Sequence, residues 1–275
     1  MKLKTLLVFT VLGIVLLACN GKTSPDENME ENPDTTSRVI EQQKISAQNV
    51  FNSIPGPTEL GRLVDDAALD YDPALPNNPD DVNKYQSDNF KALNLGVYGA
   101  DMAYANIHQQ SQESMLFLKC VNLLCKSLGI AGVFDEKTVD RLEANKENKD
   151  SLLTIINKSF LQADKFLRDN QRPHTSSLMV AGGWIEGLYL SAKVGTQSKN
   201  KKFIKKMSEQ GQSLTDLITL VETARVTGDG TFVLDGLKDL KTSYEKIQPG
   251  TTMDDALLAE VDRKVSALRK KIILQ

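Results

Sequence analysis

Two pairs of an acid and a tyrosine are the strongest candidates for a functional site in this sequence. Asp101 precedes Tyr104 by three positions, and Glu186 precedes Tyr189 by three. Residues three apart on a helix are neighbours, so each acid would lie beside its tyrosine. One interpretation is a ligand pocket lined by these four side chains, with Trp184 as a stacking ring. The other is that two helices cross at the centre of the protein, where the buried acids accept tyrosine O–H or backbone N–H bonds.

Small residues surround both pairs. Gly96, Gly99 and Ala103 would share one face of the first segment, and Gly183 and Gly187 one face of the second. A glycine inside a helix costs about 1 kcal/mol relative to alanine, so clustered glycines need a reason. Close approach of two helices supplies one and favours the interpretation in which these segments cross.

The sequence contains few residues that could bind a metal ion or act as a catalytic nucleophile. The chain has 2 His and 3 Cys, and no Gly-rich phosphate loop or nucleophile elbow occurs. In one helix the Cα atoms of Cys120 and Cys125 would lie ~8.6 Å apart, which is too far for a disulfide. We expect both to be buried free thiols, and the sequence predicts no catalytic residue, metal or cofactor.

The N-terminus has the pattern of a lipoprotein signal peptide. Lys2 and Lys4 precede an apolar run from Leu6 to Ala18, and Cys19 follows directly. The run is shorter than the roughly 20 residues that a spanning helix needs. We therefore expect residues 1–18 to be removed and Cys19 to carry lipid that holds the protein on a membrane. Asn20, where Asp would favour inner-membrane retention, favours the outer membrane.

Residues 19–38 are expected to be the lipidated cysteine and a disordered acidic linker. From position 20 to 38 the chain has no Leu, Ile, Val or aromatic residue, and its acids outnumber its bases. Such a segment cannot bury enough apolar surface to fold. An acidic stretch after the lipidated cysteine resembles a surface-export signal, while a plain spacer would leave the domain on the periplasmic face. Both locations stay open.

Residues 39–275 are predicted to form one all-α domain. Apolar residues recur there at helical spacing, and we expect a bundle of about eight or nine helices. Residues 71–81 hold three prolines and should form an ordered loop or a chain of short turns. The formal net charge of −3 argues against a nucleic-acid binder that works by bulk charge.

A lysine cluster is the strongest local charge in this domain. It gathers around Phe203 and Ile204 and consists of Lys199, Lys201, Lys202, Lys205 and Lys206. It could meet lipid phosphates or an acidic partner. The alternative is a solvated helix start, although cations there oppose the helix dipole.

Three motifs carry a resemblance to a known group. They are Ser53-Ile54-Pro55-Gly56-Pro57, the stretch from Ala92 to Asp101 (ALNLGVYGAD), and that from Gly182 to Tyr189 (GGWIEGLY). With the lipoprotein signal, they make the chain similar to uncharacterised all-helical lipoproteins of Bacteroidota. The resemblance covers roughly residues 46–194. It implies an outer-membrane-associated helical domain and supplies no catalytic or binding residues.

Two functions follow as expectations. The first is a non-enzymatic binding or scaffold component of the cell envelope, with a protein partner or a small ligand at the bundle centre. The second is a hydrolase of an envelope polymer that uses Asp101 and Glu186 as paired carboxylates. For a glycosidase these groups must lie about 5–9.5 Å apart in an open cleft.

Overall fold

The computed structural model describes residues 33–53, 70–134, 136–145 and 148–274. These residues contain ten α-helices and two short 3₁₀ helices, η1 and η2, and no strand, so the predicted all-α fold is confirmed. The predicted signal peptide and Cys19 lie outside the described residues. The elements are α1 Pro33–Ser53, η1 Pro79–Lys84, α3 Asp88–Ile107, α4 Ser111–Ser127, α5 Glu136–Ala144, α6 Lys149–Asp169, α7 Pro173–Ser198, α8 Lys201–Ser208, α9 Gly211–Thr223, η2 Gly228–Gly230, α10 Phe232–Tyr244 and α11 Asp255–Ile273.

The helix count within the described ranges exceeds the eight or nine predicted for the whole domain. The eight-residue α8 and the nine-residue α5 account for the difference. Each is about two turns long and has too few apolar positions to form a recognisable stripe.

The first helix begins earlier than the sequence indicated. The predicted linker ends at residue 38, whereas α1 begins at Pro33. Proline suits the first turn because its missing N–H would have no partner there. Residues 33–38 of the predicted linker thus lie in α1.

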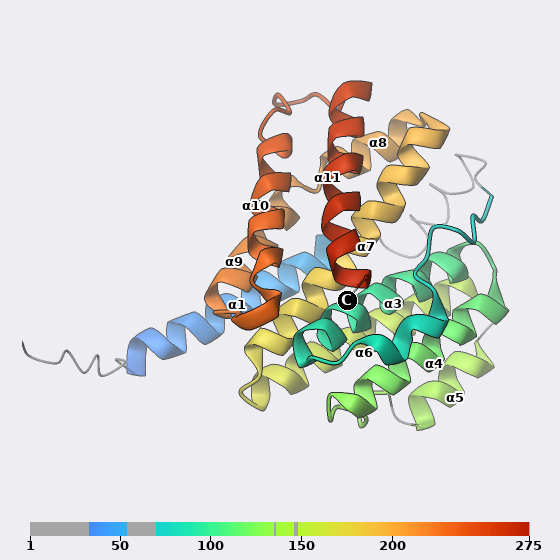
Figure 1. Cartoon of the computed structure of the whole chain (residues 1–275), viewed down its shortest axis with the longest axis vertical. Coiled ribbons are helices and arrows are strands. Elements are labelled where there is room, and N and C mark those ends of the chain that lie inside the picture. The colour runs from blue at the N-terminus through green and yellow to red at the C-terminus, as the bar shows by residue number, and fades with distance from the viewer. Residues whose placement is uncertain (1–32, 54–69, 135, 146–147, 275) are drawn as a thin grey trace, which may run out of the picture.

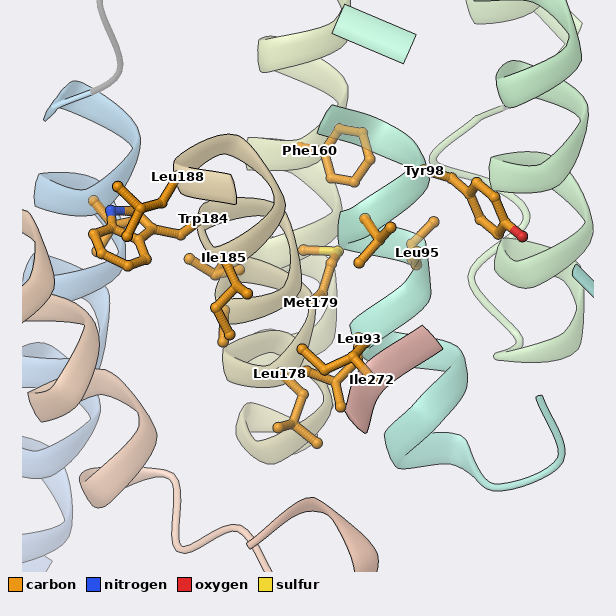
Figure 2. Packing of buried hydrophobic residues seen from close by; sticks show 14 of the residues in the cluster. Leu93, Leu95, Tyr98, Phe160, Leu178, Met179, Trp184, Ile185, Leu188 and Ile272 are labelled. Carbon is orange, nitrogen blue, oxygen red and sulfur yellow. The ribbon is translucent and has the colours of Figure 1, made fainter. Parts of the chain in front are cut away.

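Helices α3 and α7 form the centre of the bundle and make the most extensive helix–helix contact among the described elements (Figure 1). Pro173 opens α7 and Lys199, with a left-handed φ of 51°, ends it, so one 26-residue helix crosses the domain. Figure 2 shows the buried side chains of both helices, among them Leu93, Met179 and Ile185.

Glycines set the distance between α3 and α7. A Cβ added to Gly182 would lie 2.0 Å from the carbonyl oxygen of Leu93, and one added to Gly96 would lie 2.1 Å from that of Met179. Neither backbone oxygen can move without separating the helices. The prediction of close helix approach is confirmed at Gly96 and at Gly183, where an added Cβ would lie 3.3 Å from the carbonyl oxygen of Gly96. Gly182 was not among the predicted positions, and a Cβ added at Gly187 would meet no atom within 4 Å.

The proline-rich segment is ordered, as predicted. It forms turns between residues 73 and 76 and then η1, whose N-cap Asn78 accepts the Asp80 N–H with its side chain. Residues 72–77 run close to α3 and α11 and hydrogen-bond to both. We call residues 72–77 the docked loop.

Among the described helices, none combines the length and apolar character that a membrane crossing requires.

Candidate functional site

Asp101 and Glu186 meet at the centre of the bundle. Both side chains have 0% exposure, and their carboxyl groups share a hydrogen bond between α3 and α7. Asp101 Oδ2 also accepts the backbone N–H of Asn77, in the docked loop, at 3.1 Å. The pairing of the two acids was one of the predicted arrangements, and the burial identifies it as the crossing of two central helices.

Arg269 completes this group from α11. Its Nε donates to Glu186 Oε2 at 2.6 Å and its Nη2 to the carbonyl oxygen of Leu75 at 2.9 Å. The guanidinium lies over the ring of Tyr189, 4.1 Å from its centroid, a cation–π arrangement. We call Asp101, Glu186 and Arg269 the carboxyl cluster.

The carboxyl cluster has a charge imbalance that a proton resolves. Two carboxylates and one guanidinium would leave a net negative charge in a site without solvent contact, which is costly. Asp101 Oδ1 and Glu186 Oε1 are buried, and among the described residues neither accepts a hydrogen bond from an N–H or hydroxyl donor, so a proton between the two acids would satisfy both. Burial, and then the charge of Glu186, raises the pKa of Asp101 well above its ordinary value. The raised pKa favours a protonated Asp101, whose carboxyl O–H donates a hydrogen bond to Glu186.

Glu186 is the acid that binds the cation of the cluster, Arg269. Burial raises the pKa of its carboxyl group, while Arg269 and the hydrogen bond from Asp101 act in the opposite direction. The result is one neutral acid, one carboxylate and one guanidinium, which together carry no net charge.

The carboxyl cluster does not provide an accessible catalytic pair. Hydrolysis of a glycan requires an open cleft that admits the sugar and water between the carboxyl groups. Here the two groups are in mutual contact and have 0% exposure, and the docked loop and α11 hydrogen-bond to them. The geometry required for the hydrolase is absent at these two residues.

A cavity of about 260 Å³ lies on another side of α3 and α7. Its wall is largely apolar and comes from α1, α3, α6, α7 and α8. The lining includes Val50, Gly99, Ala100, Ala103, Ile107, Phe160, Met179, Gly187, Leu188, Val194, Phe203 and Met207. The structure thus contains a ligand-sized space that the sequence did not outline.

Tyr104 and Trp184 line this cavity, whereas Asp101, Glu186 and Tyr189 are not among its lining residues. The prediction that all five residues form one pocket is therefore wrong. Tyr104 and Trp184 are 7% and 8% exposed. On α7, Trp184 and Glu186 face different sides because two positions advance a helix by about 200°, and on α3 the three positions from Asp101 to Tyr104 leave about 60° between the two side chains.

The polar atoms of the two aromatic side chains are already engaged. The Tyr104 hydroxyl accepts the backbone N–H of Asp72 at 3.1 Å, and Trp184 Nε1 donates to Ser213 Oγ at 3.0 Å. Both rings thus present apolar surface to the cavity. Figure 2 shows Trp184 and Leu188 extending from α7 toward the side where α1 lies.

The cysteines of the domain are buried and free. Cys120 and Cys125 both lie in α4, and neither forms a disulfide. This confirms the prediction from their spacing. In the part of the chain that the structure describes, no three His, Cys, Asp or Glu side chains gather where they could hold a metal ion.

The lysine cluster lies on and just before α8. Asn200 caps this helix by accepting the N–H groups of Lys202 and Phe203, and Phe203, Ile204 and Met207 are buried. Lys206 is at once a lining residue of the cavity and 39% exposed at its side chain. The cluster is therefore next to the cavity, a relationship that the sequence did not show.

Comparison with known proteins gives no further assignment. No family model, curated protein or solved structure matches the chain. The similarity to helical lipoproteins of Bacteroidota stays a prediction from its three motifs and the lipoprotein signal.

Proposed function

We propose that this protein is a lipid-anchored binding component of the cell envelope, and that its helical domain binds a small apolar molecule in the cavity lined by α1, α3, α6, α7 and α8. Lipid on Cys19 would attach it to the outer membrane, with the domain on the periplasmic face or the cell surface. The lipoprotein signal supports the anchor, and the cavity supports the binding role.

The cavity is costly unless something fills it. Protein interiors are close-packed, and an enclosed apolar void destabilises a fold by about 24 cal/mol per Å³. At that rate, a closed void of this size would cost about 6 kcal/mol; a partly open one instead exposes its apolar wall to water. A bound apolar ligand offsets the cost in both cases.

Gly187 is the observation that carries the binding proposal. It lines the cavity in the interior of α7, and a Cβ added there would meet no atom within 4 Å. Close helix approach explains Gly96 and Gly182 but cannot explain Gly187. An alanine would gain about 1 kcal/mol of helix propensity at such a site. The glycine is therefore best understood as keeping the space open.

Titration with a neutral apolar probe, N-phenyl-1-naphthylamine, tests the binding role. Trp184 is the single tryptophan of the chain and lines the cavity, so its fluorescence should report the bound probe. We expect saturable binding that quenches Trp184. The Gly187→Leu variant, whose new side chain occupies the cavity, should lose binding while unfolding at the same or a higher temperature.

Gly132→Leu is the matched control. Gly132 also has no atom within 4 Å of an added Cβ, but it does not line the cavity. This variant should bind the probe like the unaltered protein. Absence of saturable binding, or equal binding by the Gly187→Leu variant, contradicts the proposal.

The anchor has its own test. Cells that express the full chain are fed an alkyne analogue of palmitate, and the protein should acquire the label and sediment with membranes. Two or three acyl chains are enough for durable attachment, at about 0.8 kcal/mol per buried CH₂. The Cys19→Ser variant should lose the label, and an unchanged label would overturn the assignment of Cys19.

A further inference from the structure

The cavity has one charged residue in its wall. Among the described residues that line it, Lys206 is the one Lys or Arg, and none is Asp or Glu. The remaining polar lining side chains are a tyrosine, a histidine, a serine and two amides, interspersed with apolar residues. An otherwise apolar wall with a single cation selects for a ligand that is apolar over most of its length and negative at one end.

Lys206 connects the cavity to solvent. Its helix, α8, also contributes the buried side chains of Phe203 and Met207 to the wall. The Lys206 side chain is 39% exposed, so it extends from this wall to the surface. A head group bound there would stay hydrated while the rest of the ligand lay between the helices.

The surroundings of Lys206 are strongly positive. From Lys199 to Gln210 the chain has five lysines and one acid, Glu209. Glu209 lies 3.4 Å from Lys206 Nζ and 4.0 Å from Lys205 Nζ, and its side chain is 47% exposed. Exposed pairs of this kind contribute less than about 1 kcal/mol, so an arriving anion can compete with Glu209 for the lysines.

From this geometry we infer that the cavity binds a single-chain amphiphile with an anionic head group. An acyl chain lies against Phe160, Met179 and Trp184, and the carboxylate or phosphate of the head is paired with Lys206. The inference rests on the proposed function. The volume of about 260 Å³ lies just below the range of about 300–1,000 Å³ for small-molecule pockets, and so suits one chain rather than a two-chain lipid.

The helix dipole does not account for this lysine. A cation in the last turn of α8 is favourable because the carbonyl end of the helix is partly negative. That effect requires only that the charge be near the helix end, which Lys205 satisfies equally. It does not require the side chain to line an apolar cavity, as Lys206 does.

Three ligands of matched chain length test the inference. Dodecanoate and 1-dodecanoyl lysophosphatidate are titrated below their critical micelle concentrations and dodecanol below its solubility limit, with Trp184 fluorescence as the readout. We expect both anions to bind at least about fivefold more tightly than dodecanol, the gain from one charge-assisted contact. Comparison of the carboxylate with the phosphate shows which source of the anionic head is preferred.

Lys206→Gln should remove the preference for the anions and leave the affinity for dodecanol unchanged. Lys201→Gln is the matched control, because Lys201 is exposed on the same helix and does not line the cavity. It should keep the preference. If both variants lose it equally, the effect is one of overall charge and the assignment to Lys206 is overturned.

The outcomes separate the two proposals. Equal affinity for dodecanol and dodecanoate, unaffected by Lys206→Gln, overturns the anionic ligand and leaves the apolar binding site intact. Failure of all three ligands to bind overturns both proposals. Binding only to anionic vesicles of phosphatidylglycerol, lost in both lysine variants and retained by Gly187→Leu, would show that α8 meets a lipid surface and would also overturn the inference.

Discussion

Arg269 Nε donates to Glu186 Oε2 at 2.6 Å and so joins the last helix, α11, to the central helix α7. The side chains are 9% and 0% exposed, and 83 positions separate them in the chain. Since the same guanidinium binds the carbonyl of Leu75, one side chain connects α11, α7 and the docked loop. This buried ion pair therefore serves the assembly of the domain.

Arg269→Met should destabilise the protein by about 3 kcal/mol, because it leaves Glu186 as a buried carboxylate without its cation. The side chain volume is nearly kept, so the loss reflects the charge and the hydrogen bonds. Chemical denaturation followed by circular dichroism measures it.

Lys193→Met is the control for this prediction. Lys193 pairs with Asp262 at 2.8 Å between the same two helices, and its side chain is 32% exposed. It also lies over Tyr189, as Arg269 does. Removal of this more exposed cation should cost less than about 1 kcal/mol. Equal losses in the two variants would show that Arg269 acts as a surface cation does.

Asp101→Asn should stabilise the protein at neutral pH. The amide imitates the protonated acid, since it can donate to Glu186 and accept the Asn77 N–H. Burial and the charge of Glu186 raise the pKa of Asp101 well above its ordinary 3.8 in the folded state. Between these two pKa values the folded protein holds a proton that the unfolded chain has lost, so the contribution of Asp101 to stability falls as pH rises.

The comparison is made by urea denaturation at several pH values. Near pH 4 the two proteins should be about equally stable. Above it, the advantage of the variant should grow by up to about 1.4 kcal/mol per pH unit until the folded-state pKa is reached. A variant that is less stable by the same amount at every pH would show that Asp101 is ionised in the folded protein.

The sequence predicted where the helices are better than it predicted which side chains they bring into contact. Apolar spacing identified the helices, and the glycines near positions 96 and 182 indicated where two of them cross. Both are local signals: helix periodicity is present within a few turns, and a glycine's cost in a helix requires a compensating contact.

Arg269 was missed because its partners are far away in sequence. A signal was nonetheless present: it lies four residues after Val265 and three before Ile272, on the face of the apolar stripe. A cation on that face must find a buried anion. The cavity had no such signal, since its wall combines five helices whose arrangement no local pattern determines.

Cys120 and Cys125 should not react with Ellman's reagent in the native protein at pH 8. Burial raises the pKa of Cys125 to about 12 and that of Cys120 to about 11. The thiolate, which is the reacting species, is therefore scarce. In the Cys19→Ser variant we expect no release of thionitrobenzoate until denaturant is added, and then two equivalents. Rapid release of one equivalent before unfolding would contradict the burial of these thiols.

Two glycines of α7 should respond in opposite ways to the same substitution. Gly182→Ala places a Cβ 2.0 Å from the carbonyl oxygen of Leu93, so α3 and α7 must separate, at a cost of about 3 kcal/mol. Gly187→Ala meets no atom within 4 Å and should stabilise the protein by up to about 1 kcal/mol through helix propensity. Guanidinium denaturation of the two variants measures both effects within one helix. A loss of stability in Gly187→Ala would mean that the space beside it is filled in the folded protein, and the cavity would then no longer explain why this position is a glycine.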